Sequence, residues 1–133
     1  MNLKKNLSKM LAMVLMVSIL TGFITIGCKT FTSTSYKSLS IAGDTGTEVM
    51  RIIMSLYKQG YVSDSEYAAA REVYIKYKAV YDGAVEALAS YKAVENQGTQ
   101  ATVVSALAEL TSLAAKLSAM LTEFQQRQNA ANK

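Results

Sequence analysis

The chain of 133 residues contains no histidine, no proline and no tryptophan, and its single cysteine is Cys28. Without histidine, it lacks the side chain that most often serves as a general base and as a metal ligand. One cysteine excludes an internal disulfide and a cysteine-cluster metal site. There is also no phosphate-binding loop, dinucleotide fingerprint or nucleophile-elbow motif. We therefore expect a protein that is not an enzyme and that needs no metal or cofactor.

The positive charge of the chain belongs mostly to its leader, the segment 1–27. Lysine and arginine number 14 against 10 acidic residues, which gives a net charge of +4 and a pI of about 9.2. Lys4, Lys5 and Lys9 lie in the leader, and removing these three leaves 11 basic against 10 acidic side chains, a net charge of +1. Because nucleic-acid binding needs a basic stripe on the folded domain, we expect no nucleic-acid partner.

The start of the chain, up to Cys28, has the order of a secretory signal. Three lysines precede Met10–Ile26, an uncharged and mostly apolar run, and Gly27 then stands directly before Cys28. The sequence Ile24-Thr25-Ile26-Gly27-Cys28 resembles the lipobox of bacterial lipoproteins, in which apolar or small residues precede a small residue and a cysteine. Thr25 stands where leucine is commoner in that family.

This resemblance implies that a signal peptidase removes residues 1–27 by cutting between Gly27 and Cys28. It also implies a diacylglyceryl group on the Cys28 thiol and a further acyl chain, such as palmitate, on the new amino group. Two or three acyl chains hold a protein firmly on a membrane. The resemblance thus implies a lipid-anchored protein of the cell membrane. Because Lys29 rather than aspartate follows Cys28, it implies the outer membrane, facing the periplasm or the cell surface, in a Gram-negative host.

Two other interpretations of the leader stay open. The apolar run could be an uncleaved single-span anchor, because its length is close to the lower limit of about 17 residues for crossing a bilayer. It could also be an ordinary cleaved signal, in which case Cys28 is incidental.

The remaining chain predicts three helices. After Cys28 and a polar tether (residues 28–34), apolar or small residues recur at steps of three and four over 35–59, 64–95 and 100–128, the period of an α-helix. The expected seam of the first helix is Leu39, Ala42, Gly46, Val49, Ile53 and Leu56. That of the third is Val103, Leu107, Leu110, Ala114, Leu117, Leu121 and Phe124. The polar tail 129–133 is expected to fray.

The predicted connections are short and carry end signals. Gly60 is expected to end the first helix, Ser63 and Glu66 to form a capping box that starts the second, and Thr99 to cap the third. Long loops are absent from this pattern, so neighbouring helices must be antiparallel. We expect an all-α, up-down-up three-helix bundle over 35–128 with coiled-coil-like packing, in which the 96–99 turn shares one end with Cys28.

Five tyrosines share one face of the second predicted helix: Tyr67, Tyr74, Tyr77, Tyr81 and Tyr91. Their rings could pack in the core with the hydroxyls reaching its rim. Alternatively, they could form a face for a protein partner or for self-association, because tyrosine is enriched at interfaces.

The pattern as a whole resembles small helical lipoproteins of bacteria and phages that carry no assigned activity. We therefore expect a non-catalytic scaffold or interaction module whose partners are a membrane and a protein. The alternative from another class is a ligand carrier or sensor with a tyrosine-lined cavity between helices.

Overall fold

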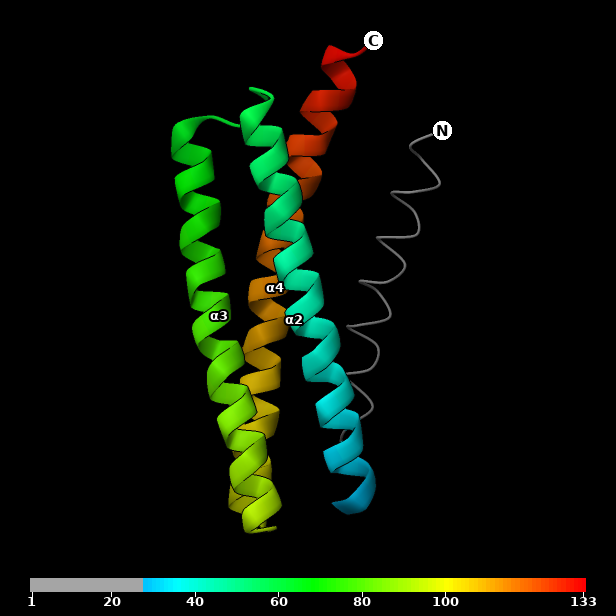
Figure 1. Ribbon diagram of the computed structural model, residues 1–133, viewed down its shortest axis with the longest axis vertical. Coiled ribbons are helices and arrows are strands. Elements are labelled where there is room, and N and C mark those ends of the chain that lie inside the picture. Colours follow the sequence, from blue (N-terminus) through cyan, green and yellow to red (C-terminus); the bar gives the residue numbers. More distant parts are fainter. Residues whose placement is uncertain (1–27) are drawn as a thin grey trace.

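The computed structural model describes residues 28–133, which form three helices: α2 (Cys28–Lys58), α3 (Asp64–Ala93) and α4 (Gln97–Ala131) (Figure 1). The predicted signal segment lies outside the described residues. Within 28–133 the backbone is helical apart from two short connections and the last residues. This confirms the predicted all-α class and the three-helix bundle.

The three helices run antiparallel in sequence order (Figure 1). The first residue of α2 and the α3–α4 turn lie at one end, which we call the proximal end. The α2–α3 turn and the C-terminus lie at the other, the distal end. All three helix pairs are in contact, and the α3–α4 pair is the most extensive. Cys28 and the 96–99 turn therefore share one end, as predicted.

The predicted seams form the core, which has two clusters. The proximal cluster contains Leu39, Tyr77, Tyr91 and Leu107, and the distal cluster contains Ile53, Leu56, Val62, Ala70, Leu121 and Phe124. All the seam residues predicted for α4 are buried. Burial of one stripe on each helix is what stabilises helices of this length, since propensity alone is a weak force.

The predicted polar tether over residues 28–34 is wrong, because α2 is helical from Cys28 onward. Phe31 is fully buried, with its ring centroid 4.9 Å from that of Tyr91 in an edge-to-face contact. The Thr34 hydroxyl donates to the Thr30 carbonyl oxygen at 2.7 Å. Phe31 extends the seam towards the start of α2, but the buried positions between it and Leu39 are Ser35 and Ser38. Because these two buried positions hold serine and not an apolar residue, the spacing of apolar residues does not show that this segment is helical.

The distal α2–α3 turn is built as predicted. Gly60 adopts a φ of 83°, a conformation that glycine accepts without strain. The Tyr61 N–H donates to the Leu56 carbonyl and the Gly60 N–H to the Tyr57 carbonyl, which is the Schellman pattern that ends a helix. The capping box that starts α3 is present, with Ser63 as its first residue.

The proximal α3–α4 turn differs from the prediction in its cap. Asn96, rather than Thr99, is the N-cap of α4, and its side chain accepts from the Thr99 N–H at 2.9 Å. Thr99 lies three positions further on and closes a capping box with its hydroxyl. Asparagine is among the best N-cap residues. With Asn96 as its cap, α4 starts at Gln97, earlier than predicted. The preceding helix α3 ends at Ala93, also slightly earlier than predicted.

The helix α4 continues to Ala131 and so includes most of the tail 129–133, which was predicted to fray. The Tyr61 hydroxyl donates to the Asn132 side chain at 3.4 Å, and the Gln128 amide donates to the Gln59 side chain at 3.0 Å. These contacts tie the end of α4 to the α2–α3 turn. The residues that bind the end of α4 are polar and lie far away in the sequence, so the local sequence pattern does not predict these contacts.

Within residues 28–133, α4 is the one helix that is long and apolar enough to cross a membrane by length and composition. The seam residues of α4 lie in the bundle core, where α2 and α3 cover them. The same length and composition are also found in core helices of globular bundles.

Gly46 is a point of close approach between α2 and α3. A Cβ atom at Gly46 would lie 2.2 Å from Cε1 of Tyr77, and the Tyr77 hydroxyl donates to the buried carbonyl oxygen of Ala42. At Gly43 a Cβ atom would meet the Tyr81 ring at 3.1 Å. The two glycines are therefore the points where α3 packs most closely against α2.

The first part of α2 is a poor helix by composition. More than half of the positions from 28 to 47 are occupied by serine, threonine or glycine. Summed propensities make this stretch roughly 6 kcal/mol less favourable as a helix than polyalanine of the same length. Contacts with α3 and α4 must supply what the local sequence lacks.

Replacing Gly46 by alanine should lower the free energy of unfolding by about 1–3 kcal/mol, because the buried Tyr77 ring must move. The matched variant Gly83→Ala lies in α3, where a Cβ atom meets nothing within 4 Å among the described residues, and should raise stability by about 0.5–1 kcal/mol. Urea unfolding followed by circular dichroism measures both. Equal stabilisation by the two substitutions would contradict the seating of Tyr77 on Gly46.

Candidate functional site

Cys28, the predicted lipidation residue, is the first residue of α2, and the preceding Gly27 lies outside the described residues. Phe31, the third residue after Cys28, is already part of the core. Each helical residue rises about 1.5 Å, so Phe31 lies about 4.5 Å along the axis from Cys28. The core of the bundle therefore begins within about one turn of the predicted acylation site.

The five tyrosines of the predicted face divide into two groups. Tyr77 and Tyr91 are 2% and 1% exposed and belong to the core. Tyr67, Tyr74 and Tyr81 are half-buried and pack against it. The rings of Tyr74 and Tyr77 are nearly parallel, with centroids 6.5 Å apart. The five tyrosines therefore do not form one exposed face. Only the half-buried rings of Tyr67, Tyr74 and Tyr81 are partly accessible to a partner.

Burial decides the state of the Tyr77 hydroxyl. Desolvation raises the pKa of this phenol far above its ordinary value of 10.0. The group therefore stays protonated and donates its hydrogen bond to the Ala42 carbonyl oxygen. Tyr77 acts here as a bridge between α3 and the backbone of α2.

A cleft of about 310 Å³ opens between α2 and α3 beside these rings. Its α2 side consists of Ser40, Gly43, Asp44 and Thr47, and its α3 side of Tyr74, Tyr77, Lys78, Tyr81 and Asp82. The cleft has room on its α2 side because Gly43 carries no side chain. Its lining offers phenol hydroxyls, carboxylates and one ammonium group, which is the chemistry of a polar site open to solvent.

A second tyrosine pair lies at the distal end. The rings of Tyr57 and Tyr67 stack with centroids 4.4 Å apart, and the Tyr57 hydroxyl donates to an Asp64 carboxylate oxygen at 2.8 Å. This hydrogen bond to a carboxylate raises the pKa of Tyr57. Tyr67 thus serves to join α2 to the start of α3.

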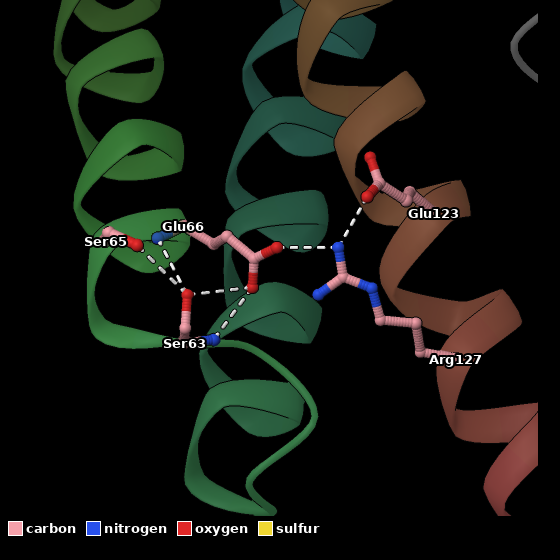
Figure 2. Close-up of polar contacts among 5 residues, drawn as sticks. All are labelled: Ser63, Ser65, Glu66, Glu123 and Arg127. Carbon is pink, nitrogen blue, oxygen red and sulfur yellow. Dashed lines mark hydrogen bonds and ion pairs between the residues drawn. The ribbon is translucent and has the colours of Figure 1, made fainter.

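The most connected polar cluster of the described residues surrounds Glu66 (Figure 2). One carboxylate oxygen of Glu66 accepts from the Ser63 N–H at 2.9 Å, and the other lies 2.6 Å from Nη2 of Arg127. The same guanidinium nitrogen binds Glu123. Arg127 and Ser63 together hold the pKa of Glu66 at about 2, below its ordinary value of 4.5. The cluster joins the start of α3 to the last turns of α4.

The sequence predicts the contact between Ser63 and Glu66 but not the contacts of Arg127. The spacing between Ser63 and Glu66 predicts their contact, because a capping box is a local signal. Arg127 lies in the next helix, near the end of α4 and about 60 residues further along the chain, and nothing in the pattern links it to Glu66. Antiparallel topology is the signal that could have suggested the contact, because it brings the end of α4 to the start of α3.

The acidic residues of the described chain do not gather into a metal site. Within residues 28–133 no three histidine, cysteine, aspartate or glutamate side chains lie close enough to hold a metal ion.

No protein-family model, curated protein or solved structure matches this chain.

The Glu66–Arg127 pair should make stability depend on pH on the acid side. Because the folded-state pKa of Glu66 is about 2 against an ordinary 4.5, its contribution is full above pH 4.5 and is lost as the pH falls towards 2. The variant Glu66→Gln keeps a capping-box side chain but removes the charge. Denaturant unfolding should show wild type more stable than Glu66→Gln at pH 7 and equal to it near pH 2. A difference independent of pH would contradict the ion pair.

Proposed function

We propose that this chain is a lipid-anchored protein of the cell envelope that acts as a non-catalytic scaffold or protein-interaction module. The observation that carries the proposal is Ile24–Cys28, a lipobox-like sequence that ends a lysine-led apolar run and contains the only cysteine. Acylation of Cys28 and removal of residues 1–27 would give a mature protein that begins at the first residue of α2.

The geometry of the bundle supports this proposal. The core begins within one turn of Cys28, so an acylated protein would hold the bundle directly against the bilayer. The bundle axis then runs from an anchored proximal end to a free distal end.

Metabolic labelling with a fatty acid tests the anchor directly. The wild-type chain, expressed in a bacterium with its own leader, should incorporate label and fractionate with membranes. Cys28→Ala should incorporate none, because no thiol remains to accept the diacylglyceryl group.

A matched control is Gly27→Ala, which keeps a small residue before the cysteine and should be labelled as well as wild type. Label that persists in Cys28→Ala would rule out the proposal. An uncleaved single-span anchor would instead give an unlabelled wild type that keeps residues 1–27 and stays in the membrane.

A second candidate function, a ligand carrier or sensor, is favoured by the 310 Å³ cleft beside Tyr74 and Tyr81. A carrier should retain a small molecule when the protein is extracted in mild detergent and weighed by native mass spectrometry. The variant Tyr81→Ala, which removes one wall of the cleft, should release that molecule. A protein that is empty in both forms would exclude the carrier.

A further inference from the structure

The first two thirds of α2 are held to the bundle by little apolar burial. Phe31, Leu39 and Ala42 are the buried apolar residues between 30 and 47, whereas Met50, Ile53 and Leu56 are buried in the shorter stretch 48–58. Rich in serine, threonine and glycine, the first stretch also has low helix propensity. Its helical state therefore depends on few contacts.

Two side chains make the docked state of this stretch costly. The hydroxyl oxygens of Ser35 and Ser38 are buried without a hydrogen-bond partner among residues 28–133, and these residues are 0% and 6% exposed. Burying a hydroxyl without a partner opposes folding, because water satisfies it in the open state. Both groups would regain hydrogen bonds if this part of α2 left the core.

The polar contacts across helices are also uneven. On the proximal side, Tyr77 binds the Ala42 carbonyl, and the Thr47 and Tyr74 hydroxyls are 3.5 Å apart beside the open cleft. On the distal side, the Glu66–Arg127 ion pair and the Gln59–Gln128 hydrogen bond tie all three helices together. The weak and strong regions of α2 therefore meet near Gly46.

We infer that residues 28–47 of α2 form a segment that undocks and redocks as a unit, while residues 49–58 stay folded with α3 and α4. The segment ends at Gly46 and Thr47, which lie between Ala42, the last buried α2 residue of the proximal cluster, and Val49, which packs against both clusters. Local opening of this kind follows from few buried contacts and low propensity. Undocking uncovers Tyr77 and Tyr91 on α3, which contact Ala42 and Phe31 in the docked state.

The consequence for an anchored protein rests on the function proposed above. As a helix, the segment spans about 30 Å, and when extended it reaches about 65–70 Å. Undocking would therefore lengthen the link between the acylated Cys28 and the rest of the bundle. The segment acts as a link with two lengths, and it couples the distance from the membrane to exposure of the tyrosine-bearing face of α3.

Hydrogen exchange followed by mass spectrometry tests the inference on the full chain in detergent micelles. Peptides within 30–47 should exchange about 100-fold faster than peptides from 49–58 or from the middle of α4, since they open without global unfolding. Gly46→Ala should accelerate exchange within 30–47 further, because it weakens the contact that holds the segment on Tyr77. Equal protection along the whole of α2 would overturn the inference, and so would a Gly46→Ala variant in which exchange within 30–47 is no faster than in wild type.

A matched pair of surface variants separates segment stability from general effects. Ser33→Ala with Ser40→Ala replaces two exposed serines within the segment, and should slow its exchange about fivefold through higher helix propensity. Ser105→Ala with Ser112→Ala makes the same change on the exposed surface of α4 and should leave 30–47 unchanged. Equal slowing of 30–47 by both pairs would contradict independent opening.

The exchange measurement does not depend on acylation, so the two proposals fail separately. Fast exchange of 30–47 in a chain that incorporates no fatty acid would keep the undocking segment and remove its role as an anchor link. Fatty-acid labelling with uniform protection of α2 would keep the anchor and overturn the segment.

Discussion

The contact between Tyr77 and α2 is the interaction on which the proximal half of the bundle depends. A ring of this size fits between α2 and α3 only because Gly46 has no side chain, and its hydroxyl is satisfied by the Ala42 carbonyl oxygen. Helix propensity opposes this part of α2, so burial of Tyr77, Tyr91 and Phe31 supplies the compensating free energy. A small local change at Gly46 therefore reaches the whole first half of the helix.

The two ends of the bundle differ in how they are held. At the distal end a Schellman turn, a capping box and an ion pair fix the end of α2, the start of α3 and the end of α4. At the proximal end the α3–α4 turn is well capped by Asn96, but the start of α2 is held mainly through the edge-to-face contact of Phe31 with Tyr91. This asymmetry is compatible with the proposed attachment through Cys28, because the better-held distal end would keep the register of the helices if the start of α2 undocked.

The sequence predicts the extent of a helix well where its buried positions hold apolar residues, and less well where they hold polar residues. All the α4 seam positions and the Ser63–Glu66 box follow from spacing alone. The pattern misses the start of α2 because Ser35 and Ser38 occupy core positions, and it misses the end of α4 because Tyr61 and Gln59, which bind it, are distant in sequence. For the candidate site, the close approach at Gly46 can be anticipated in kind, since small residues permit it. The Arg127 pair and the cleft depend on three-dimensional placement that no local pattern encodes.

The proposed function depends on Cys28 being the acylated N-terminus of the mature helical bundle. Intact-mass spectrometry of the protein purified from bacterial membranes tests this claim most directly. We expect a chain of residues 28–133 that carries a diacylglyceryl group and, where the host adds it, an amide-linked acyl chain. A membrane-bound chain that begins at Met1, or one that begins after residue 27 with the mass of the unmodified polypeptide, would contradict it.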